Sequence, residues 1–68
     1  MFNSVETDIL EFLNRPGKAN STLVEICAEL PKRNPGVIKA SVKALVESGD
    51  VWNEGSPARY LAINPIPA

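Results

Sequence analysis

In the first fifteen residues, apolar positions recur every three to four residues, which is the spacing of one face of an α-helix. The apolar side chains that fall on one face are Val5, Ile9, Phe12 and Leu13. Acidic residues lie between them, as expected for the solvent-facing side of an amphipathic helix. Asn3 or Ser4 is suited to cap the start of this helix, and Pro16 followed by Gly17 predicts its end.

A polar link over residues 17–21, with one or two extended residues, leads to a second helical pattern. Thr22 and Glu25 have the spacing of a capping box, in which each side chain accepts a hydrogen bond from the other residue's backbone. Apolar residues on a shared face follow at Leu23, Ile26 and Leu30. We expect this second helix to begin after Thr22 and to end at Pro31.

A third helix is predicted after a four-residue link. Asn34 is a favourable N-cap, Pro35 occupies the first helical position, and Gly49 is a natural C-cap. The apolar face consists of Ile38, Val42 and Leu45. The strength of these signals at both ends predicts a helix over 35–48.

The last third of the chain predicts a two-stranded β-hairpin. The strands are expected at Val51–Asn53 and Arg59–Ile63, joined by a turn that contains Gly55 and Pro57. Leu61 and Ile63 lie on one side of the second strand. They are expected to face the helices.

The two aromatic residues of the hairpin have different expected roles. Tyr60 is expected to pack across the strands and cover the edge of the core. Trp52 points outward if Val51 faces the core, because successive side chains of a strand alternate between its faces. An exposed indole there would mark a partner interface.

The composition limits the classes of protein that remain. The chain has 68 residues, 44% of them hydrophobic, which suits one small domain, expected over 1–64 with a flexible tail over 65–68. It has no histidine and a single cysteine, Cys27, so an internal disulfide and a His or Cys metal cluster are excluded, and we expect no metal and no cofactor. No nucleotide-binding motif or activated nucleophile is present, which favours a protein that is not an enzyme.

Further expectations concern location. No apolar run approaches the length of about 20 residues that a membrane span requires. We therefore expect no membrane association, and a cytoplasmic, nucleoid-associated protein. The single cysteine suits a reducing compartment.

The charge is distributed unevenly along the chain. The formal net charge is −1, yet the segment 31–46 contains no acidic residue. Its basic residues are Lys32, Arg33, Lys39 and Lys43. The segments before and after it are both net acidic. One basic surface on an otherwise acidic protein is the electrostatic pattern to be explained.

The order of helix, helix, short turn, helix and hairpin, from Val5 to Ile63, resembles the winged helix-turn-helix domains of small prokaryotic or phage DNA-binding regulators. The segment Ile9–Arg15 is similar to the first helix of fimbrial-operon regulators of the PapI/FaeA type. The wing, Gly55-Ser56-Pro57 followed by an aromatic residue, is similar to that of Z-DNA-binding winged helices. Lys39 and Lys43 stand where that second family has Asn and Tyr, which disfavours recognition of left-handed DNA.

The resemblance implies an α+β fold of three helices with a hairpin wing, the third helix in the major groove of double-stranded DNA and the wing on its backbone. The residues then in place to contact DNA are Lys32, Arg33, Asn34, Lys39, Lys43 and Arg59. The function implied is regulation of transcription, with a homodimer or a regulatory protein partner supplying further specificity.

Each of these residues also has an ordinary structural explanation, as a solvated helix face, a surface turn or a helix cap. The alternative function is a winged-helix protein–protein interaction module that does not bind DNA directly. The overall acidity of the chain favours this alternative. Fold alone does not decide between the two.

Overall fold

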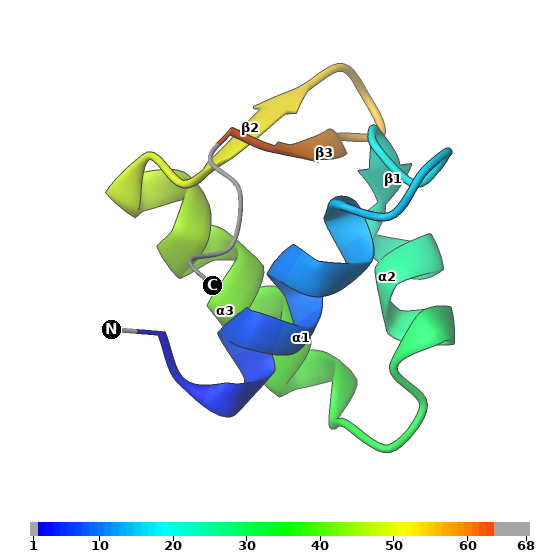
Figure 1. Ribbon diagram of the computed structural model, residues 1–68, viewed down its shortest axis with the longest axis vertical. Helices are drawn as coiled ribbons and strands as arrows, with labels where there is room; N and C mark the ends of the chain where they lie inside the picture. The colour runs from blue at the N-terminus through cyan, green and yellow to red at the C-terminus, as the bar shows by residue number, and fades with distance from the viewer. Residues whose placement is uncertain (1, 64–68) are drawn as a thin grey trace.

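The computed structural model describes residues 2–63 as three helices and one antiparallel sheet of three strands (Figure 1). The elements in chain order are α1 (Ser4–Leu13), β1 (Ser21–Thr22), α2 (Leu23–Glu29), α3 (Pro35–Ser48), β2 (Val51–Glu54) and β3 (Arg59–Ala62). The expected tail over 65–68 lies outside the described residues. No helix of the described part has both the length and the apolar character needed to cross a bilayer.

Capping boxes start the first two helices, of which the one at Thr22 was predicted. Asn3, rather than Ser4, caps α1: its Oδ1 accepts from the Glu6 N–H at 2.8 Å, and Glu6 Oε1 accepts from the Asn3 N–H at 3.0 Å. Thr22 caps α2 in the same way, with its N–H donating to Glu25 Oε1 at 2.9 Å. Each box satisfies backbone N–H groups that have no partner inside the helix.

The predicted limits of α3 are confirmed as well. The Asn34 side chain accepts from the Gly36 N–H at 2.7 Å, and Pro35 is the first helical residue. Gly49 ends the helix with φ 86°, a left-handed conformation that glycine adopts without steric cost.

The first two helices end earlier than the prolines predict. Leu30, directly before Pro31, has φ −123° and ψ 59°, so α2 stops at Glu29. The proline ring disfavours helical angles in the residue before it, so Leu30 is the C-cap of α2 and not its last helical residue. At the end of α1, the Asn14 side chain donates to the Leu10 carbonyl at 2.8 Å.

The two-stranded hairpin of the prediction is a three-stranded sheet with the order β1-β3-β2. Ser21 pairs with Tyr60, and Thr22 pairs with Arg59. A strand of two residues is too short to show an alternating pattern in the sequence, so this third strand was predicted only as extended residues in a link.

The expectation that Leu61 and Ile63 face the helices is wrong. Val51 is 2% exposed and pairs with Ala62, whereas Leu61 and Ile63 are 37% and 49% exposed. Paired residues of an antiparallel sheet share a face, so the buried Val51 places Ala62 and Tyr60 toward the helices. Tyr60 packs against the core, as predicted.

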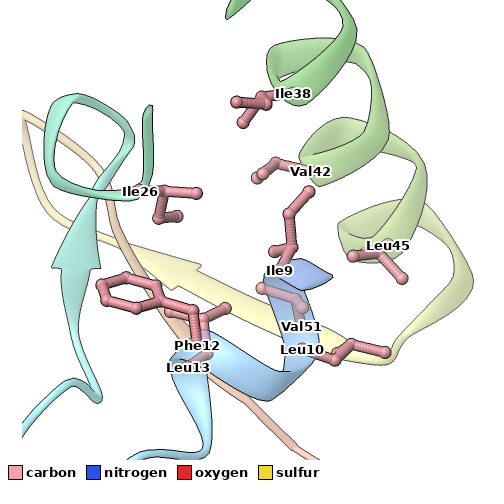
Figure 2. Close-up of a cluster of buried hydrophobic side chains, with 9 residues drawn as sticks. All are labelled: Ile9, Leu10, Phe12, Leu13, Ile26, Ile38, Val42, Leu45 and Val51. Carbon is pink, nitrogen blue, oxygen red and sulfur yellow. The ribbon is translucent and has the colours of Figure 1, made fainter. Parts of the chain in front are cut away.

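The core lies between the helices and the inner face of the sheet (Figure 2). Its buried side chains are Ile9, Leu10, Phe12, Leu13, Ile26, Ile38, Val42, Leu45 and Val51. The apolar faces predicted for α1 and α3 supply most of them, and α2 supplies Ile26. Cys27 is half-buried at the margin of this cluster.

Candidate nucleic-acid interface

The core packing of α3 leaves its two lysines in solvent. Ile38, Val42 and Leu45 are at most 2% exposed and anchor the helix to α1 and the sheet. Lys39 and Lys43 are exposed, and residues four apart lie one above the other on a helix. The two ammonium groups are therefore carried on one open side of a rigid helix.

These lysines border a cleft between α3 and the inner face of the sheet, with a volume of about 380 Å³. Asn53 and Tyr60 line it from the strands. Its remaining lining is Leu23, Val46 and Glu47. Positive charge thus stands at the mouth of a cleft whose walls include an aromatic ring and aliphatic side chains.

Glu47 reduces the positive charge of this surface. It lies one turn after Lys43 on the same side of α3 and lines the same cleft. Electrostatic attraction of an anion is therefore expected to be strongest toward the N-terminal half of α3, near Lys39. The N-terminus of α3 adds to this attraction, because the helix dipole favours negative charge there.

The basic residues of the link before α3 are held in a different place. Arg33 donates from Nε and Nη2 to Asp8 Oδ2, at 3.0 Å and 2.8 Å. Among residues 2–63, this is the one ion pair found, and both of its side chains are about one-third exposed. Arg33 therefore joins the link to α1, and its charge is largely compensated by Asp8. Lys32 is exposed beside it.

Arg59 is directed toward the opposite edge of the sheet. Its Nη1 donates to the Asn20 carbonyl at 3.3 Å, and it lines a hollow with Lys18, Glu25 and Glu29. The pKa of Glu25 is lowered, chiefly by hydrogen bonds from the backbone N–H and the hydroxyl of Thr22, with Arg59 and Lys18 adding attraction.

The structure therefore separates the predicted DNA contacts into three groups. Lys39 and Lys43 border one cleft, Lys32 and Arg33 lie at the link before α3, and Arg59 lies near β1. The Asn34 Oδ1 is used as a helix cap. Trp52, predicted as a partner contact, is 55% exposed, so its outward orientation is confirmed.

Sequence reasoning missed Asn53 and Tyr60 as neighbours of the two lysines. Both lie on the inner face of the sheet, and Tyr60 was assigned to core packing alone. Alternation from Val51, which faces the core if Trp52 points outward, would have placed Asn53 on the same side as α3.

Comparison of the chain with protein-family models, with curated proteins and with solved structures gives no match. Its function is therefore inferred from the site itself. Within residues 2–63, no three His, Cys, Asp or Glu side chains are grouped so that they could hold a metal ion.

Proposed function

We propose that this chain is a winged helix-turn-helix protein that binds double-stranded DNA and regulates transcription without catalysis. In this proposal α3 enters the major groove, and the β2–β3 hairpin is the wing beside the backbone. One observation carries the proposal: Lys39 and Lys43 stand exposed, one turn apart, on a helix anchored along its opposite side. The order of elements and the capped link between α2 and α3 support the same class of fold.

The exposed side of α3 has a shape that suits close approach to DNA. Gly36 and Ala40, three residues before Lys39 and Lys43 respectively, are also exposed, so small side chains flank the two charges. The helix has 14 residues, or roughly 21 Å of length. The major groove of B-form DNA, about 12 Å wide, accepts a helix of this kind.

The residue types favour contacts with phosphate over reading of bases. Lysine acts as a compact positive charge, whereas discrimination between bases more often uses Arg, Asn or Gln. Lys32, exposed at the link, would add a contact at the edge of the interface. Arg33 and Arg59 contribute less in this proposal, because Asp8 and the surroundings of Glu25 already hold them.

The proposal is tested by titrating ¹⁵N-labelled protein with a mixed-sequence duplex at low salt and then at rising salt. We expect amide shifts along α3 and in the wing, with the logarithm of affinity falling linearly against the logarithm of salt concentration. Replacing Lys39 or Lys43 with alanine should reduce the steepness of that line by about one per lysine. Lys18→Ala is the matched control, because Lys18 is an exposed lysine in another hollow.

Two results would count against DNA binding through α3. One is the absence of shifts at low salt, where nonspecific binding is strongest. The other is an equal loss of affinity in Lys18→Ala and Lys43→Ala, which would indicate diffuse attraction. Either result would favour the second candidate function, a protein-interaction module, for which the exposed Trp52 is the specific supporting observation.

A further inference from the structure

The outer face of the sheet carries large apolar side chains in solvent. Trp52 is 55% exposed, Leu61 37% and Ile63 49%. Trp52 and Leu61 are direct cross-strand partners, so their side chains are adjacent on this face. Ile63 follows two residues after Leu61 and therefore belongs to the same side. A cluster of exposed apolar residues of this kind is typical of a contact surface.

Strand β2 also offers an edge of backbone groups to which no strand is paired. It lies at the end of the strand order and pairs only with β3. The Ile63 N–H donates to the Asp50 carbonyl at 2.9 Å, so Asp50 and Ile63 face each other with their backbone polar groups. In an antiparallel pair, residues that bond to the partner strand alternate with residues that point away from it. Every second residue of β2 therefore points its N–H and C=O away from β3, and these residues are Val51 and Asn53.

Acidic residues flank the aromatic side chain of this edge. Glu54, the last residue of β2, stands two residues after Trp52 on the same side of the strand. Asp50 directly precedes β2, two residues before Trp52, and its carbonyl accepts from the N–H of Ile63. One oxygen of the Asp50 carboxylate accepts from the Ser48 hydroxyl at 2.6 Å. Arg59 is opposite Glu54 in the register, but its guanidinium donates to the Asn20 carbonyl instead. Ion pairing among the described residues is confined to Arg33 and Asp8, so Glu54 keeps an uncompensated charge.

This charge pattern disfavours a second copy of the same strand in the register centred on Trp52. Antiparallel pairing of two β2 strands centred on Trp52 would place Asp50 of each copy directly opposite Glu54 of the other. Like charges directly opposite each other destabilise a strand pair. A strand with a basic residue at both of these positions and an apolar residue between them has the complementary pattern.

We propose that the free edge of β2 binds an extended peptide segment of another protein that carries basic, apolar and basic residues at alternate positions. The segment adds a fourth strand to the sheet, with main-chain hydrogen bonds to Val51 and Asn53. Its apolar side chain packs on Trp52 and Leu61, and its two basic side chains lie opposite Asp50 and Glu54. The outer face with Trp52 and Leu61 is opposite the cleft of Lys39 and Lys43, which the Asn53 side chain lines, and the proposal does not rest on DNA binding.

The probe is a blocked heptapeptide of sequence Thr-Lys-Thr-Val-Thr-Lys-Thr, added to ¹⁵N-labelled protein. We expect the amide signals of Val51 and Asn53 to shift, together with the indole signal of Trp52, the only tryptophan of the chain. A peptide with glutamate in place of lysine, and one methylated at alternate backbone nitrogens, should each bind about fivefold more weakly or worse.

Variants of the protein separate backbone pairing from side-chain effects. Asn53→Pro removes the outward N–H at a position where an edge strand tolerates proline, and it should weaken binding by about fivefold. Asn53→Ala keeps that N–H and should bind the peptide like the natural chain. Glu54→Lys should weaken binding of the lysine peptide and strengthen binding of the glutamate peptide. Far-UV circular dichroism of each variant establishes that it is folded.

The proposal is overturned if no amide of β2 shifts at millimolar peptide, or if the lysine and glutamate peptides bind equally. Shifts confined to Lys39 and Lys43 would also overturn it. So would concentration-dependent self-association that Asn53→Pro abolishes, because a second copy would then occupy the edge. Methylated peptide that binds as tightly as the unmethylated one would exclude strand addition even if Asn53→Pro does not fold.

Discussion

The two faces of the small sheet differ in a way that their residue types alone do not explain. The inner face packs Val51, Tyr60 and Ala62 against the helices. The outer face leaves Trp52 and Leu61 exposed, although they are at least as apolar. The pairing register of the whole sheet thus decides which side of each strand enters the core. Apolar residues on the other side require a separate explanation.

The outer face itself divides into two halves. At its β1 end, the side chains form hydrogen bonds within the chain. The Thr22 hydroxyl accepts from the Glu25 N–H at 3.3 Å, and the Arg59 guanidinium donates to the Asn20 carbonyl. At its β2 end the side chains of Trp52 and Leu61 are apolar and exposed. The first half stabilises the fold, whereas we propose that the second is for recognition.

The largest expected difference between the faces is the cost of shortening an apolar side chain. Val51→Ala should lower the free energy of unfolding by about 2 kcal/mol, since it removes buried methyl groups and leaves a cavity. Leu61→Ala should lower it by about 1 kcal/mol or less, because that side chain is 37% exposed and its main contact is the cross-strand pair with Trp52. Urea denaturation followed by circular dichroism measures both. Equal losses would mean that the two faces do not differ as described.

A smaller effect is expected from the capping bond on the outer face. Thr22→Ala should cost about 1 kcal/mol of unfolding free energy, because alanine cannot accept from the Glu25 N–H. Thr22→Ser is the matched control, since it keeps the hydroxyl and should remain close to the natural stability. If serine and alanine destabilise the protein equally, the contribution of Thr22 comes from the strand and not from the cap.

The smallest effect is a dependence of stability on pH at Glu25. Its pKa in the folded protein is lowered from the ordinary value of 4.5, chiefly by the hydrogen bonds from Thr22. A lowered pKa means that the ionised carboxylate stabilises the fold at neutral pH, and that this stabilisation is lost as the pH falls through the lowered pKa. Thermal melts of the natural chain and of Glu25→Gln should therefore differ slightly at pH 7 and converge in acid. A difference that persists in acid would assign the effect to packing.

The helices were predictable because their signals are local. Asn3 with Glu6, Thr22 with Glu25, and Asn34 with Pro35 each act over at most three residues, so no distant contact was needed to recognise them. The sheet was less predictable. β1 has two residues and pairs with a strand almost forty positions away, and its sequence contains no periodic pattern to reveal that pairing.

The candidate site was also predictable where it depends on local spacing, and not where it depends on distant contacts. Lys39 and Lys43 share a face because helical spacing requires it, and their exposure follows from the buried residues between them. The partners of Arg33 and Arg59 could not be predicted, since Asp8 and Asn20 come close to them only when α1 and β1 are in place. Asn53 and Tyr60 join the cleft for the same reason.

The sequence by itself determined where the three helices begin, which of their faces enter the core, and that the basic residues gather before and along the third helix. These features depend on interactions between residues a few positions apart. Only the tertiary structure decided which face of the sheet is buried, which basic side chains are compensated, and which edge of the sheet stays open. Those outcomes depend on contacts between distant segments, whose geometry is set when the helices and strands pack together.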